Sequence, residues 1–385
     1  MTVSVTHPVQ IPIARPYIGE EEAAAAAEVV RSGWLTQGKQ VQAFEDALVA
    51  YTGARHAIVV SNCTTALHLA LVAAGVGPGD EVICPSFTYI ATANAVVHAG
   101  GTPVFVDIDP QTYNTTPELL EAAITPRTKV LMPVDQIGLA ADMPAIMELA
   151  RRRGLIVVED AAPTLGATVH DQKIGTFADL TCFSFHPRKS ITTGEGGLIT
   201  TENDDLAERL KTIRSHAAST SAFARHASGT TDIEEYRELG WNYRMTDVQA
   251  AIGLVQLSRL DGILAERRRL AERYSRLLGV DARIQVPYVP PERPHTYQSY
   301  CVWLHGGAPR ADIMAALAAR GIATRRGVMA SHLEPYYRER YPDLSLPVTE
   351  QASAETLLLP LYVGMAEADQ DLVIESLLAA LDGKA

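Results

Sequence analysis

Short apolar runs alternate with amphipathic stretches along the first 160 residues of the chain. Nearly every position in the runs is apolar, which is typical of strands buried on both faces of a parallel sheet. In the stretches between them, apolar residues recur near the helical spacing, and Gly and Pro mark the connections. The predicted strands cover residues 56–61, 81–85, 103–107, 129–134 and 155–160, and the predicted helices cover 65–74, 90–99, 117–124 and 143–153.

Further elements flank this alternation on both sides. They are a helix at 20–31, strands at 180–185 and 196–201, a helix at 203–216, a long helical segment at 247–278 with mild interruptions at its two glycines, a strand at 297–305 and a helix at 311–320. The order predicts an α/β fold. We expect a large domain at 1–268, in which helices flank a mostly parallel central sheet, and a smaller C-terminal α/β domain at 269–385.

Composition narrows the class of protein. The chain of 385 residues is 47% apolar and has 45 acidic against 33 basic side chains, a formal charge of −12. The basic residues are scattered, which argues against nucleic acid as a partner. The N-terminus lacks a signal-peptide pattern, and no apolar stretch approaches the roughly 20 residues that span a bilayer. The four cysteines lie far apart, so we expect a cytoplasmic protein with reduced thiols, no membrane contact and no metal site.

Asp160 and Lys189 form the first combination that indicates a chemistry. Alone, Asp160 at a strand end would be a turn cap, and Lys189 in a Ser/Thr/Gly-rich segment would be a solvated surface residue. Pyridoxal phosphate needs both residue types, because a carboxylate keeps its pyridine nitrogen protonated and only a primary amine forms an imine with its aldehyde. Together, Asp160 and Lys189 indicate a site for this cofactor.

The cofactor's phosphate needs an anchor, and the segment SNCTTALHLAL at 61–71 offers one. Thr64 and Thr65 fall in the first turn of a predicted helix, where free N–H groups and the helix dipole favour an anion. An ordinary helix cap explains the same segment equally well. Ser184 is a candidate for a further hydroxyl. GEGG at 194–197 lacks the ending of a nucleotide-binding P-loop, so we interpret it as a tight turn.

Six segments between about residue 13 and beyond residue 334 resemble the DegT/DnrJ/EryC1/StrS aminotransferases. They are SNCTTALHLAL, GPGDEVICPSFTYIATANAV, GTPVFVDID, VVEDAAPTLGA, FSFHPRKSITTGEGG and GWNYRMTDVQAAIGLVQL. The family consists of fold type I pyridoxal-phosphate enzymes that act mostly on keto sugars linked to nucleotides. The resemblance implies that Lys189 is the Schiff-base lysine and proton shuttle and that Asp160 is the partner of the pyridine nitrogen. It also implies that Thr64, Thr65 and Ser184 hold the phosphate.

The same resemblance implies roles around the cofactor. Tyr89 would stack on the ring, with a core aromatic as the alternative. Asn242 of the GxNxR motif would reach the neighbouring subunit's phosphate, which implies a homodimer with shared active sites. Arg244 would serve substrate or interface, or form an ordinary surface ion pair. His186 would lie near the substrate or contribute only to packing.

The chain departs from the family pattern at two places. Where the family usually has a glutamine that touches the cofactor's phenolic oxygen, this chain has Pro163, which offers no donor. Thr164 is a candidate to substitute for it. Where many members read HLYG after the strand at 129–134, this chain reads DQIG at 135–138. We therefore expect different surroundings for the cofactor ring and the substrate.

The implied reaction moves an amino group from an amino acid, by family habit L-glutamate, to a keto sugar, foremost a keto-deoxysugar linked to a nucleoside diphosphate. The cofactor would alternate between pyridoxal and pyridoxamine phosphate, with Lys189 moving the proton. A diphosphate needs cations, and the candidates are Arg244, Arg325, Arg326 and His332. The GWLTQG segment at 33–38 resembles a family loop near the substrate.

Four alternatives stay open at this point. A cyclitol aminotransferase of antibiotic biosynthesis would share the same core. A sugar dehydratase of this fold has histidine in place of the catalytic lysine, which Lys189 argues against. A non-catalytic regulatory paralogue is disfavoured by the intact pair of Lys189 and Asp160. A dehydrogenase ranks last, because the first βα turn lacks a GxGxxG motif.

Overall fold

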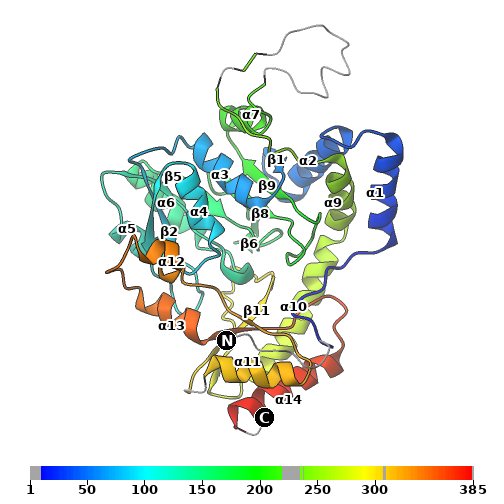
Figure 1. Cartoon of the computed structure of the whole chain (residues 1–385), viewed down its shortest axis with the longest axis vertical. Helices are drawn as coiled ribbons and strands as arrows, with labels where there is room; N and C mark the ends of the chain where they lie inside the picture. The colour runs from blue at the N-terminus through cyan, green and yellow to red at the C-terminus, as the bar shows by residue number, and fades with distance from the viewer. Residues whose placement is uncertain (1–9, 219–234, 237, 307–308, 384–385) are drawn as a thin grey trace.

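The computed structural model describes residues 10–218, 235–236, 238–306 and 309–383, and its largest sheet has seven strands in the order β1-β9-β8-β5-β4-β2-β3 (Figure 1). Neighbours from β8 to β3 are parallel, and β9 is antiparallel to both β1 and β8. The predicted mostly parallel α/β sheet is confirmed. The bounds are β1 His56–Val60, β2 Glu81–Pro85, β3 Thr102–Val106, β4 Thr128–Leu131, β5 Ile156–Asp160, β8 Leu180–Ser184 and β9 Gly197–Thr201.

Each predicted helix is present, and several elements were not predicted, among them α2, α14 and the hairpin of β6 Thr168–Val169 and β7 Gln172–Lys173. Side chains of Asn62, Thr116, Asp142, Asn203 and Thr246 cap α3, α5, α6, α7 and α9. The bounds are α1 Glu20–Ser32, α2 Lys39–Thr52, α3 Cys63–Ala73, α4 Ala91–His98, α5 Pro117–Ala122, α6 Met143–Arg153, α7 Asp204–Ile213, α9 Asp247–Ser258, α10 Leu260–Leu278, α11 Arg310–Ala319, α12 Pro335–Arg338, α13 Pro347–Glu355, α14 Glu367–Leu381, and the 3-10 turns η1 Gln136–Gly138 and η2 Ser331–Leu333.

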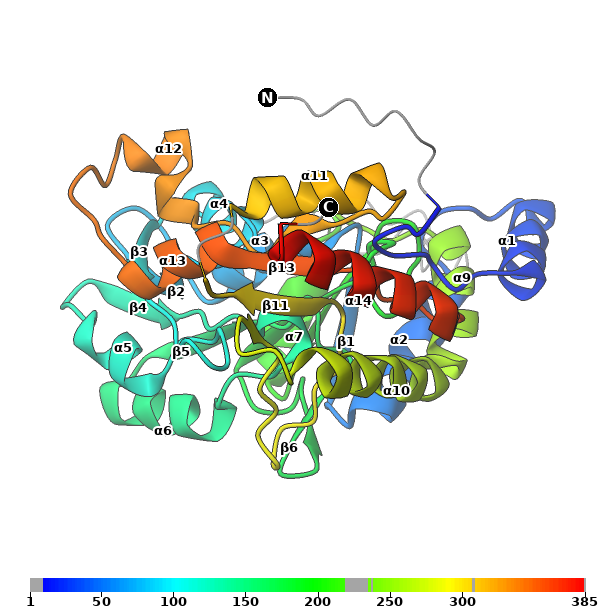
Figure 2. The ribbon, with the colours of Figure 1, turned by 90° about the horizontal axis from the view of Figure 1, so that it is seen from below.

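The long helical segment predicted at 247–278 is two helices, α9 and α10, that meet at Arg259. The backbone of Arg259 has φ −103° and ψ −5°, outside the helical values, so the break lies between the two glycines rather than at either of them. Gly253 does not break the helix but lies at a close contact between helices. α9 lies beside α1 and α2 (Figures 1 and 2), and a Cβ at Gly253 would lie 2.5 Å from the ring of Phe44 on α2. The glycine lets the two helices approach each other closely.

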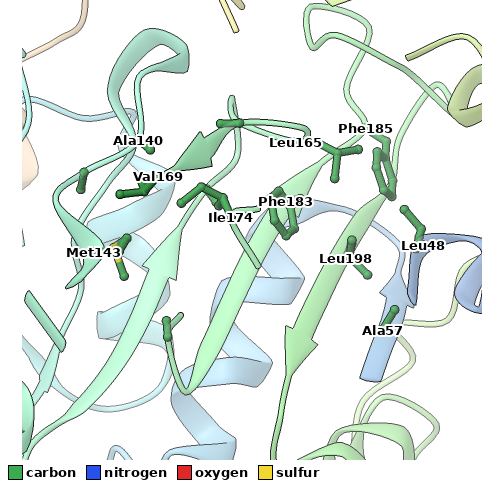
Figure 3. Packing of buried hydrophobic residues seen from close by; sticks show 14 of the residues in the cluster. Leu48, Ala57, Ala140, Met143, Leu165, Val169, Ile174, Phe183, Phe185 and Leu198 are labelled. Carbon is green, nitrogen blue, oxygen red and sulfur yellow. The ribbon is translucent and has the colours of Figure 1, made fainter. Parts of the chain in front are cut away.

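Alternate residues of the strands feed two cores on opposite faces of the sheet. On β8, Phe183 belongs to one core and Cys182 to the other, and on β9 Leu198 and Ile199 divide in the same way. Figure 3 shows Phe183 and Leu198 in the first core with Leu48 of α2. Helices α2, α6, α9 and the first half of α10 cover this core, and α3, α4 and α7 cover the second. Burial on both faces explains the nearly continuous apolar runs.

A second, antiparallel sheet has the order β10-β11-β13-β12, with β10 Ile284–Gln285, β11 Tyr300–Leu304, β13 Thr356–Leu359 and β12 Arg325–Arg326. Val302 faces a core shared with α11 and α14, which lie at the lower end of the molecule in Figure 1. Trp303 faces the opposite side and packs in a core with Phe87 and Ile108, which follow β2 and β3. This last core joins the second sheet to the large one.

The domain boundary expected between residues 268 and 269 falls inside α10. Leu260, Ile263 and Leu264 of this helix belong to the first core of the large sheet, whereas Leu270 and Tyr274 belong to the core of the second sheet. One continuous helix therefore contributes to both cores. The division into two domains stays a prediction.

The sequence predicts no membrane contact, no metal site and reduced thiols, and the described residues bear on each of these. None of their helices is long and apolar enough to cross a membrane, and none of their His, Cys, Asp and Glu side chains gather in groups suited to a metal ion. Cys63, Cys84, Cys182 and Cys301 are all free thiols.

Two glycines in helices give a matched test of this packing. We expect Gly253→Ala to lower the free energy of unfolding by about 1–3 kcal/mol, because the new methyl group would meet the fully buried Phe44 ring. Gly262→Ala, with nothing within 4 Å of its Cβ, should raise it by about 0.5–1 kcal/mol through helix propensity. Thermal or denaturant unfolding of both variants measures the difference. Equal effects of the two substitutions would contradict the close packing of α9 on α2.

Candidate active site

The carboxyl ends of the parallel strands bring predicted site residues to one edge of the large sheet. β1, β2, β5 and β8 run in the same direction, so the residues that follow them lie along the same edge. Asp160 ends β5 and Ser184 ends β8, while Thr64 and Tyr89 follow the ends of β1 and β2 by four residues each. The loop from β8 to β9 carries Lys189 along this edge.

The carboxylate of Asp160 is buried and held from two sides. Its Oδ2 accepts a hydrogen bond from Thr92 Oγ1 at 2.7 Å, and its Oδ1 accepts one from Ala162 N at 3.2 Å. Burial raises the pKa of Asp160, while the hydrogen bond from Thr92 and the charge of Lys189 oppose that rise. A cation placed against this carboxylate would stabilise its ionised form.

Lys189 lies in a loop that the second half of the chain helps to fix. The Nε2 of Gln298 donates to the carbonyl oxygen of the preceding residue, Arg188, at 2.7 Å. Burial lowers the pKa of Lys189, and the acidic groups of Cys63 and Asp160 oppose this shift. The lysine therefore gives up its proton more readily than a surface lysine and lies within the field of the Asp160 carboxylate.

The first turn of α3 presents donors at the same edge. Asn62 Oδ1 accepts from Thr65 N at 2.9 Å, and Thr65 Oγ1 donates to Asn62 O at 2.7 Å, so the Thr65 hydroxyl is engaged within the turn. No described residue forms a hydrogen bond with the Thr64 hydroxyl. Gly197 of β9 passes so close that a Cβ there would lie 2.5 Å from Asn62 O and 2.8 Å from Cys63 N. The GEGG segment thus lets β9 run against this turn.

Tyr89, Ser184 and His186 lie near the strand ends with different degrees of exposure. Tyr89 is 68% exposed, so it is not the core aromatic of the alternative interpretation. Ser184 is buried, and its Oγ accepts from His186 N at 3.4 Å. His186 is half-buried, its Nδ1 accepts from Arg188 N at 3.2 Å, and burial lowers its pKa.

Arg244 and Asn242 belong to a segment that runs beside β1. Arg244 forms an isolated antiparallel bridge with Val60, and its Nη1 donates to Ser215 Oγ at 3.3 Å. The side chain lines a cavity of about 430 Å³ together with Gln37 and others from the GWLTQG loop, and none of the strand-end residues lines this cavity. Asn242 is exposed. The structure therefore brings Arg244 to the GWLTQG loop, apart from Lys189 of the same chain.

His332, the remaining candidate for substrate binding, is buried between two partners. Its Nδ1 lies 2.6 Å from Ser86 Oγ, and its Nε2 lies 3.4 Å from Glu350 Oε1. Its main-chain N–H also donates to Ser86 Oγ at 3.0 Å. Both ring nitrogens are thus engaged in joining the segment after β12 to the end of β2.

Comparison with known proteins agrees with this arrangement of fold and site. A model of the DegT/DnrJ/EryC1/StrS aminotransferase family matches residues 16–378. The chain belongs to this family. It is 40% identical to the spore coat polysaccharide biosynthesis protein SpsC of Bacillus subtilis, over 95% of this chain and 96% of that protein.

Solved structures of family relatives superpose closely on the chain. The aminotransferase TlmJ from Streptoalloteichus hindustanus is 34% identical with a TM-score of 0.90, covering 97% of this chain and 99% of that one. NtdA from Bacillus subtilis, solved with bound pyridoxamine phosphate, is 34% identical with a TM-score of 0.83, covering 94% of this chain and 82% of that one. The prediction of a fold type I, pyridoxal-phosphate-dependent aminotransferase is confirmed.

The residues at the strand ends of this aminotransferase fit the cofactor. Asp160 offers a carboxylate to a ring nitrogen, and Lys189 offers an amine to an aldehyde. The free hydroxyl of Thr64 and the first turn of α3 suit a phosphate. Ser190 Oγ, beside Lys189, is buried without a hydrogen-bond partner among the described residues, as expected of a group that a ligand completes. Tyr89 offers an uncovered ring face.

Several residues around Asp160 were not predicted. Thr92 lies on a predicted helix, but nothing in its spacing relates it to Asp160, 68 residues away. Asp135 and Glu159 form a fully buried pair of carboxyl groups behind Asp160. The Oδ2 of Asp135 accepts from Thr164 Oγ1 at 2.6 Å, whereas no donor reaches Glu159 Oε1. Two facing carboxyl groups without enough donors need a proton between them.

The two departures from the family pattern meet at this pair. Asp135 opens the DQIG segment, and its partner Thr164 directly follows Pro163. Burial raises the pKa of Asp135 to about 7, and burial together with the Asp135 carboxyl raises the pKa of Glu159 well above its usual value. The pair therefore retains a proton near neutral pH. The Thr164 hydroxyl donates to Asp135. It therefore does not replace the donor that the family's usual glutamine supplies at position 163.

The Asp135 carboxyl makes the stability of the protein depend on pH. Its pKa is raised on folding from about 4, so the folded state binds the proton more tightly and the free energy of unfolding falls as the pH rises from about 4 through 7. Asp135→Asn removes this titration and should flatten the decline by up to about 1.4 kcal/mol per pH unit. Unfolding measured from pH 5 to pH 8 tests this.

Asp142→Asn is the matched control, because Asp142 is an exposed helix cap at which asparagine caps equally well. Its stability profile should run parallel to that of the wild type. If the Asp135→Asn profile also runs parallel, the buried carboxyl does not hold the proton assigned to it.

Proposed function

We propose that this aminotransferase transfers the amino group of an amino acid, L-glutamate by the habit of its family, to a keto sugar linked to a nucleoside diphosphate. The observation that supports it most is the placement of Lys189 within the field of the buried Asp160 carboxylate at the carboxyl edge of the sheet. The relationship to SpsC, named for polysaccharide biosynthesis, favours a carbohydrate acceptor.

Lys189 is the proposed proton carrier. When bound, pyridoxal phosphate takes up the amino group and withdraws the electrons left when the Cα–H bond breaks. The Nζ of Lys189, whose pKa burial lowers, accepts the Cα proton as a neutral amine and returns it as an ammonium. Thr92 and Ala162 donate to Asp160 from two sides, which favours its carboxylate form.

Other residues hold the cofactor in place in this proposal. The Asp160 carboxylate faces the ring nitrogen, and the exposed Tyr89 ring covers one face of the cofactor. Thr64, Thr65 and Ser184, with the free N–H groups of the first α3 turn, hold the phosphate. His186, half-buried three residues before Lys189, lies on the substrate side.

We propose a homodimer with shared sites. Asn242 is exposed, and its neighbours Trp241 and Tyr243 pack on His68 of α3, with ring centroids 5.0 and 5.9 Å apart. The backbone at Asn242 is thereby fixed while its side chain stays open to a second subunit. Arg244, two residues after Asn242, lines a cavity together with the GWLTQG loop, and in this dimer that cavity serves the substrate at the partner's site.

Lys189→Ala tests the proposed role. L-Glutamate converts the bound cofactor from its aldehyde to its amine form, and absorbance follows this conversion. We expect the variant to convert the cofactor at least about a hundredfold more slowly, because the positioned proton carrier is lost. Lys173→Ala is the control, since Lys173 is a second lysine whose pKa burial lowers, but it lies over the Tyr51 ring at 3.4 Å. Its rate should match that of the wild type. A Lys189→Ala protein that converts the cofactor at the normal rate would refute the assignment.

A further inference from the structure

A short buried segment just before strand β11 reaches from the second sheet to the loop that carries Lys189. It consists of residues 295–298, and all four of them are buried. The Nε2 of Gln298 donates at 2.7 Å to the carbonyl oxygen of Arg188, the residue before Lys189. In the described part of the chain, no other residue from outside the β8–β9 loop forms a hydrogen bond to residues 187–190. This one contact therefore ties the loop at the position of Lys189.

The guanidinium of Arg267 on α10 holds the backbone from which Gln298 projects. Its Nη1 donates to Tyr297 O at 3.0 Å, to Gln298 O at 3.2 Å and to Leu361 O at 3.5 Å. Arg267 is buried and has no acidic partner among the described residues, and burial lowers its pKa to about 10. A buried cation without a counter-ion is costly. Here the printed hydrogen bonds of that cation go to carbonyl oxygens, two of which belong to the segment 295–298.

The backbone of the segment is strained at Tyr297. This residue has φ 49°, in the left-handed region that residues other than glycine seldom adopt. Its N–H donates to His295 Nδ1 at 2.8 Å, and its ring stacks on the His295 ring with centroids 4.2 Å apart. Its carbonyl oxygen is held by Arg267. Such a conformation persists only where the surroundings determine it, and it is concentrated at functional sites.

The large sheet anchors the same segment from the other side. Thr296 N donates to Gly138 O at 2.8 Å, and Thr296 Oγ1 lies 3.0 Å from Gly138 O and 3.1 Å from Pro163 O. A Cβ at Gly138 would lie 2.5 Å from Thr296 Oγ1 and 2.8 Å from Gln298 N. The segment thus packs against DQIG and Pro163, the two places where the chain departs from the family pattern. Gln298 reaches the loop from a backbone fixed on both sides.

We propose that Gln298, held in place by Arg267, is a positioning residue for Lys189. Its side-chain donor fixes the carbonyl group of Arg188 and thereby the place from which the Lys189 amine acts. This inference rests on the proposed function, which makes Lys189 the proton carrier. Proton transfer requires the two heavy atoms to lie within hydrogen-bond reach, so a loop released at Arg188 slows the reaction without weakening the binding of the donor.

The test compares the holoenzyme with the variants Gln298→Met and Gln370→Met. Methionine keeps the length of the side chain and removes its donor. Gln370 is the matched control, because it is also buried and its Nε2 also donates to a carbonyl oxygen, that of Leu270 at 2.9 Å. It lies on α14, at the lower end of the molecule in Figure 1. Thermal unfolding verifies that both variants fold.

Two measurements are made on each protein. The conversion of the cofactor is followed against L-glutamate concentration, which separates the limiting rate from half-saturation. Hydrogen exchange of the full-length holoenzyme reports on the backbone of residues 186–193, in which Lys189 N donates to His186 O at 2.8 Å.

We expect Gln298→Met to lower the limiting rate by about tenfold, with the half-saturating glutamate concentration nearly unchanged, and to accelerate exchange in residues 186–193. Gln370→Met should match the wild type in both measurements. Arg267→Met should act in the same direction as Gln298→Met. The two substitutions together should slow the reaction less than the product of their separate effects, because both act through one contact.

Two results would overturn the inference while leaving the proposed function intact. One is a Gln298→Met protein with the limiting rate and the loop exchange of the wild type. The other is an equal slowing by Gln370→Met, which would indicate a general loss of stability rather than the positioning of Lys189. A wild-type holoenzyme that does not react with L-glutamate would instead overturn the proposed function, and this inference with it.

Discussion

Asp160 and Lys189 lie at the same edge of the buried sheet, and the charge of each acts on the other. The strands supply the position of Asp160, and the loop from β8 to β9 returns Lys189 to the same edge. Burial acts on both groups toward neutrality, raising the pKa of the acid and lowering that of the amine, and their mutual attraction opposes both shifts. The balance leaves an acid whose charge a bound cation can stabilise and an amine that exchanges its proton easily. Both are properties that pyridoxal chemistry uses.

The residues around Asp160 must compensate for the burial of its carboxylate. Thr92 and Ala162 satisfy the Asp160 oxygens, and the Asp135 and Glu159 carboxyl groups behind it are tolerated only by retaining a proton. Burying three carboxyl groups together is unfavourable, and such clusters are typical of functional sites. The second sheet contributes from outside through the Trp303 core and the Gln298 hydrogen bond.

Much of this could be predicted from the sequence, because the relevant signals are local. The apolar runs predict the bounds of eight strands to within three residues at each end, and the residues that follow parallel strands must share an edge. The sequence could not reveal contacts set by tertiary packing. The hydrogen bond from Thr164 to Asp135 spans 29 residues, the Arg244 cavity joins loops about 200 residues apart, and the burial of His332 depends on Ser86. The break at Arg259 was missed because neither glycine nor proline marks it.

The covalent attachment of the cofactor tests the central claim most directly. Reduction of the holoenzyme with borohydride, followed by digestion and mass spectrometry, fixes the cofactor to the amine that holds its aldehyde. The chain has six lysines. Among those in the described residues, it is the charge of Lys189 that acts on the Asp160 carboxylate. The account predicts the label on the peptide that contains Lys189 and on no other. A label on a different lysine, or none in a protein that retains its cofactor, would contradict it.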